Sequence, residues 1–490
     1  MAVKFDDVSF AYQVASLAAA EAEYGAPILS DFQHVFEPGT LTLIVGPSGS
    51  GKSTALRLIN GLIPHINSGK VNGKVTVAGL DVATSELAEL GQRTATVFQN
   101  PRNQFFAATV GEELAFARQQ AGEPREEIMA RVQQVAERIG LAGWLHRSLH
   151  QLSGGELQRV ACGTMLTSPA DIFLFDEPTS NLSGEAVEDI AEIIRQMKAD
   201  GATIIVAEHR LYFLRDLVDT VITVDKGRIS RVWPAQEFYA LSDQRRRELG
   251  LRILTPPQLS PTHQQSASDA DEGLELRNVR FSYGSRRILD IDRLSFPAGQ
   301  VTALLGANGI GKTTLCRVIT GLAQAERGGT ISWRGKPQSA KQRLAMSSLV
   351  MQDVHRQLFA ASVREEVTTG TKSRSDVDVA QILAQLDLSE HAEDHPMSLS
   401  GGQKQRLVIA SAVADKANVV IFDEPTSGVD YRHLTQITER VREVAAGGAA
   451  VIVVSHDLEF VNECADRVVW LTATDGEPAA ATSAGGKEPA

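Results

Sequence analysis

The sequence predicts an α/β protein built from two copies of one domain. The apolar run Leu41 to Val45 leads into a glycine-rich turn and then into a helix-like stretch, Ala55 to Ile63. The run Val301 to Leu305 leads into a second turn of the same kind. The other apolar runs alternate with helix-length segments, as expected for a mainly parallel sheet covered by helices.

The repeat extends to the spacing of the motifs. The letters LSGG occur at 152–155 and 399–402, and IFLFDEP at 172–178 is matched by VVIFDEP at 419–425. Ser153 precedes Asp176 by 23 positions, as Ser400 precedes Asp423. Each copy also opens with an alternating strand that ends in an aromatic residue, at 8–12 and 279–283. Two copies of one domain are therefore expected.

Composition shifts set the domain boundaries. We expect a first domain at 1–253, a flexible linker at 254–273, a second domain at 274–473 and a disordered tail at 474–490, because the linker and tail have little to bury. The polar stretch Ala235 to Leu251 is rich in helix formers and predicts a helix that closes the first domain. The Ala-rich excursion Gln13 to Ala26, absent from the second copy, predicts a short surface helix.

The composition is that of a soluble globular protein. The 490 residues are 43% hydrophobic and 22% charged, and the net charge of −12 disfavours a broad nucleic-acid surface. Cys162, Cys316 and Cys464 lie far apart without metal-ligand spacing, which favours reduced core residues in a cytosolic protein. No apolar stretch is long enough for a membrane helix, and no signal peptide is recognised.

The glycine-rich turns have the pattern of phosphate-binding loops. Glycines allow backbone N–H groups to point at a phosphate, and the following helix N-terminus adds a partial positive charge. Lys52 is placed to reach the β and γ phosphates, and the Ser53 hydroxyl to ligate Mg²⁺. The expected ATP-binding residues of the two loops are Gly46, Ser48, Gly49, Gly51, Lys52, Ser53 and Thr54, and Gly306, Asn308, Gly309, Gly311, Lys312, Thr313 and Thr314.

The motifs together resemble the ATP-binding subunits of ABC transporters over both domains. Phosphate loop, LSGG signature, apolar strand ending in Asp-Glu and distal histidine occur in that order, twice. The resemblance implies P-loop NTPase domains with an antiparallel subdomain and a helical subdomain that carries the signature. It also implies two composite ATP sites, each between the phosphate loop of one half and the signature of the other. Ser153, Gly154, Gly155, Ser400, Gly401 and Gly402 are the signature residues.

The resemblance also implies the remaining site residues. Mg²⁺ is expected at Ser53, Gln99 and Asp176 in one half and at Thr313, Gln352 and Asp423 in the other. Glu177 and Glu424 are the expected catalytic groups that polarise water, with His209 and His456 at the γ phosphate. Tyr12 and Tyr283 match the adenine-stacking position, although Tyr24 is an alternative to Tyr12.

One position departs from the family pattern. Ser183 stands where the second copy has the usual aspartate, Asp430, so communication between the sites is expected to be asymmetric. Because each copy keeps its lysine, glutamate, histidine and signature, we expect both sites to hydrolyse ATP.

The segment after each glutamine resembles the ATPases of energy-coupling factor (ECF) importers. The letters NQFFAATVGEE at 103–113 are matched by RQLFAASVREE at 356–366. The resemblance implies uptake of vitamins or transition-metal ions, with this chain peripheral on the cytoplasmic face of the membrane. Its partners would be an integral membrane T-component and a small substrate-binding S-component.

In such importers this segment meets the membrane subunit. Phe105, Phe106, Leu358 and Phe359 are the expected contacts, and the glutamate pairs 112/113 and 365/366 are expected to face basic groups. The alternative is that the aromatic residues are core and the glutamates a solvated face.

Two other functions are compatible with tandem domains. One is the ATPase of a sugar or peptide importer, which the paired motifs fit less well. The other is a soluble ribosome-associated ABC protein, for which a long basic helical linker is expected and a short polar one is found. The transported compound, the weighting of the two sites and the stoichiometry are not determined by the sequence.

Overall fold

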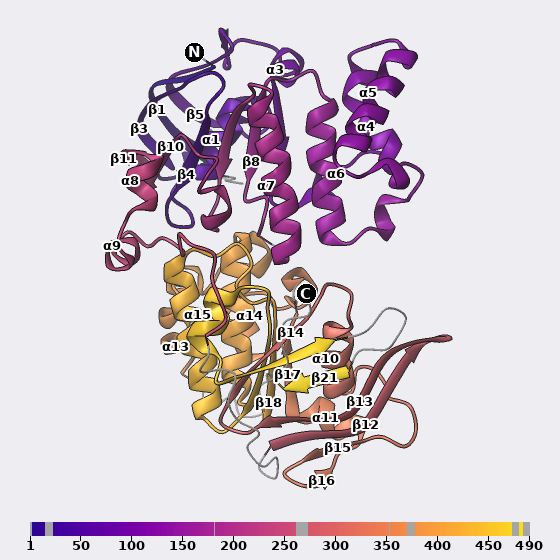
Figure 1. The fold of residues 1–490 in the computed structure, drawn as a ribbon. Coiled ribbons are helices and arrows are strands. Elements are labelled where there is room, and N and C mark those ends of the chain that lie inside the picture. Colours follow the sequence, from indigo (N-terminus) through magenta and orange to yellow (C-terminus); the bar gives the residue numbers. More distant parts are fainter. Residues whose placement is uncertain are drawn as a thin grey trace. The chain divides into compact units, whose positions relative to one another are not determined.

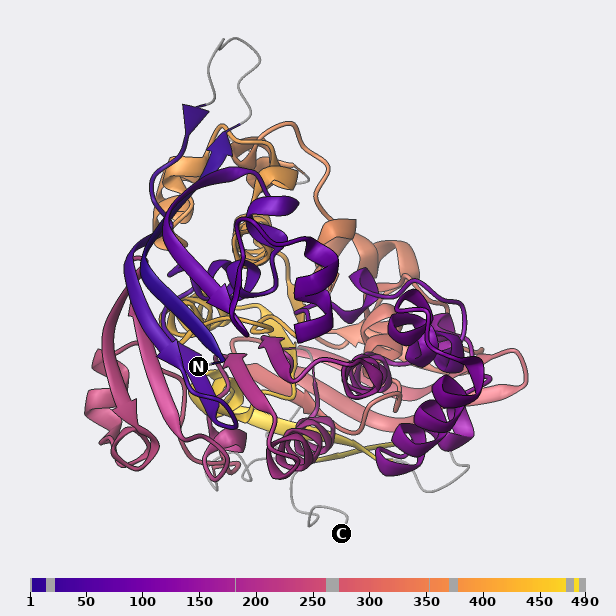
Figure 2. The same ribbon diagram turned by 90° about the horizontal axis from the view of Figure 1, so that it is seen from above.

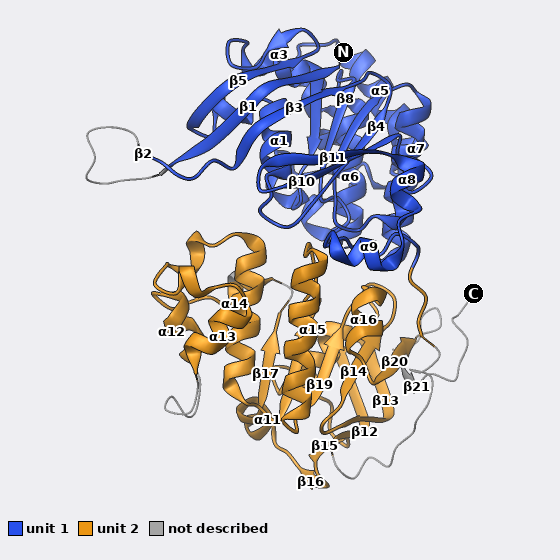
Figure 3. Ribbon diagram, turned by 90° about the vertical axis from the view of Figure 1, so that its left-hand side faces the viewer, with its two compact units in different colours: residues 1–256 blue, residues 257–490 orange. Residues whose placement is uncertain are grey.

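A computed structural model of the chain divides into two compact units, residues 1–256 and 257–490 (Figure 3). The structure describes residues 2–14, 23–180, 182–260, 273–351, 353–369, 378–472 and 480–483. Figure 1 labels the elements of both units. Across the described residues, no helix combines the length and the apolar character needed to cross a bilayer.

The first unit alternates strands and helices, as the sequence predicts. Its strands are β1 (Val3–Val14), β2 (Glu23–Tyr24), β3 (Leu29–Phe36), β4 (Leu41–Val45), β5 (Gly69–Val77), β6 (Leu80–Asp81), β7 (Thr94–Val97), β8 (Ile172–Asp176), β9 (Thr203–Ala207), β10 (Thr220–Asp225) and β11 (Arg228–Pro234). Its helices are α1 (Lys52–Ile59), α2 (Leu62–His65), α3 (Leu87–Arg93), α4 (Val110–Gln120), α5 (Arg125–Arg138), α6 (Gly154–Thr167), α7 (Gly184–Ala199), α8 (Ala235–Tyr239) and α9 (Asp243–Glu248).

The central sheet of this unit places the ends of its strands at the site. Its order is β11-β10-β4-β9-β8-β7, parallel except for β11 at the edge. Strands β4, β8 and β9 are buried at every residue, because helices cover both faces of a parallel sheet. The phosphate loop follows β4, and Asp176 ends β8, next but one in the sheet.

A second, antiparallel sheet lies beside helix α1. Strand β1 pairs with both β3 and β5, and the long indigo strands of this layer are seen from above in Figure 2. Aromatic side chains from β1 and β3 fill its inner face, with the Phe5 and Phe32 ring centroids 5.1 Å apart. The layer packs against the apolar residues of α1, which include Leu56 and Ile59, and so supports the phosphate loop from one side.

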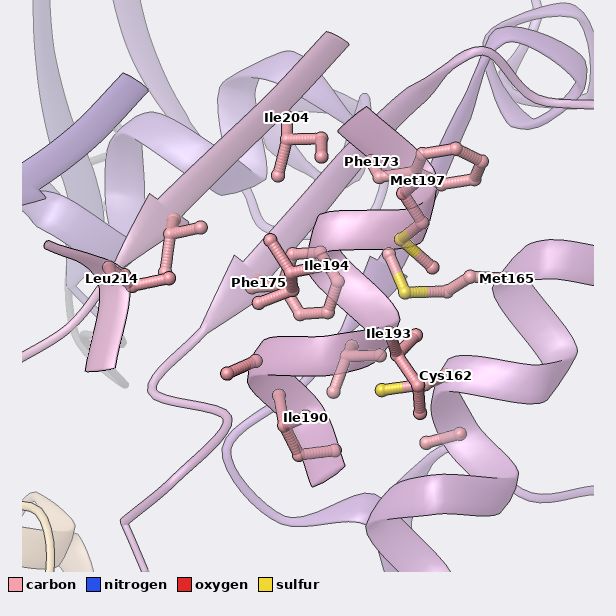
Figure 4. Packing of buried hydrophobic residues seen from close by; sticks show 14 of the residues in the cluster. Cys162, Met165, Phe173, Phe175, Ile190, Ile193, Ile194, Met197, Ile204 and Leu214 are labelled. Atoms are coloured by element: carbon pink, nitrogen blue, oxygen red, sulfur yellow. The ribbon is translucent and has the colours of Figure 1, made fainter. Parts of the chain in front are cut away.

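Helices α4, α5 and α6 form a separate helical layer, seen on the right of the first unit in Figure 1. The main core lies where α6 and α7 meet the central sheet. Figure 4 shows Cys162 and Met165 of α6, Ile190, Ile193, Ile194 and Met197 of α7, and Phe173 and Phe175 of β8 gathered in one cluster. The three cysteines of the chain are buried and unpaired, as expected.

The second unit repeats this architecture. Its strands are β12 (Gly273–Tyr283), β13 (Arg286–Pro297), β14 (Val301–Leu305), β15 (Thr330–Trp333), β16 (Lys336–Pro337), β17 (Ser347–Val350), β18 (Val419–Asp423), β19 (Ala450–Val454), β20 (Arg467–Thr472) and β21 (Ala480–Ser483). Its helices are α10 (Lys312–Thr320), α11 (Ala340–Met346), α12 (Val363–Thr368), α13 (Val379–Gln385), α14 (Gly401–Asp415), α15 (Tyr431–Ala446) and α16 (Leu458–Cys464).

The order of the second central sheet is β17-β18-β19-β14-β20-β21. Read from the opposite edge, the first sheet has the same order, β7-β8-β9-β4-β10-β11, with the antiparallel strand in the same place. The antiparallel layer β13-β12-β15-β16 and the helices α12, α13 and α14 also correspond. The expected α/β architecture, two tandem domains with mainly parallel sheets and with antiparallel and helical subdomains, is confirmed.

Several local expectations differ from the structure. The stretch 235–251 forms two short helices, α8 and α9, instead of one, because the chain turns at residues 240–242. In the excursion 13–26, Gln13 and Val14 pair with Tyr24 and Glu23 in a strand ladder, whereas 15–22 lie outside the described residues. Within the tail, Ala480–Ser483 form β21 on the edge of the sheet.

The described part of the linker contacts the second unit. The Ser260 N–H donates to Asn462 Oδ1 at 2.9 Å, and Asn462 Nδ2 donates to the Gln258 carbonyl at 2.7 Å. Leu259 packs against the core of that unit. Residues 261–272 lie outside the described part of the chain.

Candidate ATP site

Both phosphate loops hold the lysine in the same way. Lys52 Nζ donates to the carbonyls of Gly46 at 2.9 Å and Pro47 at 3.1 Å. Lys312 Nζ donates to Gly306 at 2.7 Å and Ala307 at 3.0 Å. Burial lowers the pKa of Lys312, because the charged ammonium loses hydration. Each loop thus presents a fixed positive charge inside a turn of backbone.

The loop glycines are required by close backbone approach. A Cβ on Gly46, whose φ is +154°, would lie 2.1 Å from the Val224 carbonyl oxygen, and one on Gly306 would lie 2.6 Å from that of Leu471. Gly51 and Gly311 have left-handed φ values of 103° and 111° where helices α1 and α10 begin. Any other residue would be strained there.

A hydroxyl and a carboxylate meet below each loop. Ser53 Oγ donates to Asp176 Oδ1 at 2.7 Å, and Thr313 Oγ1 donates to Asp423 Oδ2 at 3.0 Å. Burial raises the pKa of Asp176 and of Asp423, although these hydrogen bonds oppose it. A buried carboxylate beside a hydroxyl is the oxygen donor set that Mg²⁺ takes together with phosphate oxygens and water. The residues therefore fit a magnesium ion.

The glutamate and histidine of each half lie beside the lysine. His209 Nε2 is 3.2 Å from Lys52 Nζ and 3.5 Å from Glu177 Oε1. In the second unit, His456 Nε2 is 3.2 Å from Lys312 Nζ and 3.7 Å from Glu424 Oε1. The lysine, histidine and glutamate of each half therefore lie close together, as the sequence predicts. Their roles stay a prediction.

Both glutamates have an unusual backbone. Glu177 has φ 49° and Glu424 has φ 53°, left-handed values that are uncommon for a residue with a side chain. Their N–H groups donate to the carbonyls of Ala207 and Val454 at 2.8 Å, at the ends of the neighbouring strands. Such strain persists where the surroundings impose it, often at functional sites. Sequence reasoning missed this feature, because Glu carries no preference for that conformation.

Polar groups contact the carboxylate of each glutamate. Gln99 Nε2 donates to Glu177 Oε2 at 2.7 Å. In the second unit, the Ser455 hydroxyl and the His456 N–H each donate to Glu424 Oε2 at 3.4 Å. Gln352, the counterpart of Gln99, lies outside the described residues. Burial, with the neighbouring Asp423 charge, raises the pKa of Glu424 to about 7.

Glu208 is a buried carboxylate that sequence reasoning missed. It precedes His209 at the position of Ser455, and Arg210 follows at the position of Asp457. Thr179 Oγ1 donates to Glu208 Oε1 at 3.0 Å, just as Thr426 Oγ1 donates to Asp457 Oδ2 at 3.0 Å. The carboxylate that anchors the loop after the glutamate therefore precedes the histidine in the first unit and follows it in the second. The threonine shared by the two copies, Thr179 and Thr426, is the sequence feature that could have indicated a carboxylate partner in each.

The signature serines begin helices α6 and α14. Ser153 and Ser400 are N-caps in capping boxes with Glu156 and Gln403. The next residues, Gly154 and Gly401, have open space where a Cβ would lie, so their backbone is accessible. The position at which Ser183 replaces the usual aspartate also differs between the units. Asp430 caps α15 by accepting from the His433 N–H at 2.8 Å, whereas Ser183 makes no side-chain cap on α7.

The three tyrosines differ in exposure. Tyr12 is half-buried, and its hydroxyl lies 3.4 Å from Thr54 Oγ1 and accepts from Arg57 Nη1 at 3.3 Å. Tyr283 is 53% exposed and Tyr24 is 46% exposed. Tyr24 therefore resembles Tyr283 in its accessibility to a base, while Tyr12 occupies the equivalent place on the strand.

The segments after the glutamines differ from expectation in part. Phe106 and Phe359 are 76% and 80% exposed, whereas Phe105 packs against the core and Leu358 is buried within it. The expectation that the glutamate pairs face basic groups of a partner is wrong for Glu113 and Glu366. Both are buried, because their carboxylates accept backbone N–H groups of their own unit.

Comparison with known proteins agrees with this geometry. The family model described as "ABC transporter" matches residues 29–180 and 271–427. Two proteins of Treponema denticola, named as candidate ABC transporter ATP-binding proteins, are 36% and 33% identical to the chain. The first match covers 91% of this chain and 92% of the relative, and the second covers 96% and 95%.

The chain belongs to the ABC transporter family. Its two ABC domains bind ATP, and the protein is an ATPase.

Solved structures of tandem ABC proteins share the fold. The structure titled "RNase-L Inhibitor" has a TM-score of 0.65 at 21% identity, over 97% of this chain and 90% of that one. A complex of an archaeal ribosomal stalk protein with the ribosome recycling factor aABCE1 has a TM-score of 0.63 at 21% identity, over 96% and 89%. At this identity the likeness concerns the fold of the ABC ATPase alone.

The exchanged anchor of Thr179 leads to a first prediction. Glu208→Ser removes the acceptor of the buried Thr179 hydroxyl and should lower the unfolding free energy of the first unit by about 1–3 kcal/mol. Adding Arg210→Asp restores a carboxylate at the position of Asp457 and should recover part of the loss. Urea unfolding of the single and double variants measures both changes. A double variant no more stable than Glu208→Ser would refute the exchange.

The pKa of Glu424 leads to a second prediction, for the protein without nucleotide and in EDTA. The Glu424 carboxyl has an ordinary pKa of 4.5 and a folded-state pKa of about 7. Between these two pH values the folded state keeps a proton on Glu424 that the unfolded chain releases. The unfolding free energy of the second unit should therefore fall as pH rises through this window, by about 1–3 kcal/mol.

Glu424→Gln, which cannot ionise, should remove this pH dependence in urea unfolding between pH 5 and 8. Glu390→Gln, at an exposed position of the same unit, should leave it in place. Equal slopes in the wild type and Glu424→Gln would show that Glu424 is ionised throughout.

Proposed function

We propose that this ABC ATPase is the energy-coupling subunit of an ECF-type importer for vitamins or transition-metal ions. It would lie on the cytoplasmic face of the membrane, docked on a T-component that works with a separate S-component. ATP-binding proteins of this family typically pair with membrane components. The resemblance of the two segments after Gln99 and Gln352 to ECF ATPases supports the finer assignment.

The observation that carries the proposal is a matched pair of exposed phenylalanines. Phe106 and Phe359 occupy the same place in the repeat and are 76% and 80% exposed, so covering them with an apolar partner would lower the free energy. Phe106 also stacks on Phe116, with ring centroids 5.0 Å apart. Two equivalent apolar points suit the apolar faces of two helices of one membrane partner.

The proposed chemistry uses the groups described above. Lys52 and Lys312, with the loop N–H groups, would bind the phosphates, and Glu177 and Glu424 would orient the attacking water and accept its proton. His209 and His456 would contact the γ phosphate. Mg²⁺, when bound, supplies charge neutralisation on the phosphates. Ser53 with Asp176, and Thr313 with Asp423, are the residues that would hold it, with Gln99 and Gln352 completing the sets.

We further propose that the signature of each half completes the ATP site of the other. Gly154 and Gly401, at the starts of α6 and α14, have the accessible backbone that a phosphate would need. Closure of the halves on ATP would then bring the two docking points together and transmit force to the partner.

Separate removal of the two glutamates tests the use of the sites. Glu177→Gln and Glu424→Gln should each lower kcat for ATP hydrolysis to about half, because each removes the base of one of two equally used sites, and the double variant should lower kcat by about 10²-fold or more. Steady-state phosphate release with equal protein concentrations measures this. A single variant with the wild-type rate would contradict equal use of the sites.

Removal of the exposed aromatic side chains tests the docking. The chain is purified from gently solubilised membranes with a tag, and co-purifying proteins are identified. A multi-span protein and a small membrane protein should accompany the wild type and should be lost with Phe106→Asp together with Phe359→Asp, because a carboxylate cannot be buried unpaired in an apolar contact.

Ile66→Asp and Leu344→Asp are the matched controls, since both are exposed apolar residues outside the docking segments. Both control variants should keep the membrane partners. Ribosomal proteins in place of membrane proteins would overturn the importer assignment, while the ATPase assignment would stand.

A further inference from the structure

The loop that carries each exposed phenylalanine is tied to its own unit at two points. At its start, the Phe98 N–H donates to Gln104 Oε1 at 3.0 Å. At its end, the N–H groups of Phe106 and Ala107 donate to Glu113 Oε2 at 2.9 and 2.8 Å. Glu113 is only 2% exposed, so its carboxylate lies inside the protein under the loop.

The second unit has the same two ties. The Met351 N–H donates to Gln357 Oε1 at 2.8 Å, and Gln357 Nε2 donates back to the Leu349 carbonyl at 2.5 Å. The N–H groups of Phe359 and Ala360 donate to Glu366 Oε2 at 2.8 and 2.7 Å. Glu366 is 5% exposed. The same arrangement recurs in both copies of the repeat, with the same glutamine, phenylalanine and glutamate.

The ties decide which side chain faces outward. A buried carboxylate is costly unless it is hydrogen-bonded, and accepting two N–H groups offsets that cost only in this loop conformation. The same conformation directs Phe105 and Leu358 into the core and leaves Phe106 and Phe359 outside. An aromatic residue that is already held in place loses less conformational freedom on docking.

The ties also connect the exposed ring to the ATP site. Gln104 holds the backbone at Phe98, directly before Gln99, whose amide donates to the Glu177 carboxylate at 2.7 Å. Glu113 holds the other end of the same loop on helix α4. Gln99 and Phe106 are seven positions apart on this segment, which is hydrogen-bonded to its own unit near both ends.

We propose that Gln104 with Glu113, and Gln357 with Glu366, are positioning residues that hold each exposed phenylalanine rigidly for an apolar helix of the membrane partner. The partner part of this inference rests on the function proposed above. In the first unit Gln99 and Phe106 lie on the same doubly anchored loop, so these ties would couple the two residues.

The exposed phenylalanine has an additional aromatic contact in the first unit that the second unit lacks at the equivalent position. In the first unit Phe106 also stacks on Phe116 with an interplanar angle of 11°. The repeat places Thr369 at the position of Phe116, so Phe359 has no stacking partner at that position. Loss of the carboxylate should therefore loosen the second loop more than the first.

Hydrogen exchange tests the brace directly in the full-length chain. Glu113→Leu and Glu366→Leu remove the acceptor, whereas Glu113→Gln and Glu366→Gln keep an oxygen that can accept both N–H groups. The amides at 106–107 and 359–360 should exchange about 10- to 30-fold faster in the leucine variants, with the larger change at 359–360, and near the wild-type rate in the glutamine variants. Urea unfolding of each variant checks that its unit remains folded.

The same variants are then tested for co-purification of the membrane partner and for stimulation of ATP hydrolysis by that partner. The leucine variants should lose both, and the glutamine variants should keep them. Fast exchange of these amides in the wild type would overturn the brace whatever the partner. Faster exchange in the leucine variants with unchanged partner binding and stimulation would overturn its role in coupling. A wild type without a membrane partner would refute the proposed function, and with it the coupling role, while leaving the exchange result valid.

Discussion

The buried lysine ammonium of each phosphate loop is the interaction on which the rest of each site depends. Lys52 and Lys312 are held by two loop carbonyls, and these carbonyls are in place only because Gly46 and Gly306 approach a neighbouring strand more closely than any side chain allows. Histidine, glutamate and aspartate then gather around this charge from the ends of adjacent strands. The parallel sheet makes this possible, since residues far apart in sequence end at one edge.

The two units share a sheet order, but the carboxylate that anchors the threonine after each glutamate comes from a different position of the repeat. In the first unit Gln99 holds Glu177 and Glu208 anchors Thr179; in the second, Ser455 faces Glu424 and Asp457 anchors Thr426. In both units the threonine hydroxyl donates to a carboxylate, which belongs to the residue before the histidine in the first unit and to the residue after it in the second. The duplicated fold therefore tolerates an exchange of partners as long as each buried polar group keeps one.

Sequence reasoning predicted the strands, the loops and the grouped site residues because these depend on local patterns. Leu41–Val45 and Val301–Leu305 form strands with the bounds the apolar runs indicate, and Lys52, Asp176, Glu177 and His209 lie together as the motifs require. It was wrong about Glu113 and Glu366, which a charged pair on a helix suggests are solvated. It also missed the left-handed backbone of Glu177 and Glu424, which the neighbouring strands impose.

The family, the ATPase activity and the identity of the residues around each phosphate loop follow from the sequence alone, because those letters recur at fixed spacing. The packing of the folded chain is needed to tell which of two adjacent side chains, Phe105 or Phe106, is exposed, and which acid, Glu112 or Glu113, is buried. Both answers depend on the packing of α4 and its loop against residues distant in the chain. Burial is a property of that packing, and no local pattern encodes it.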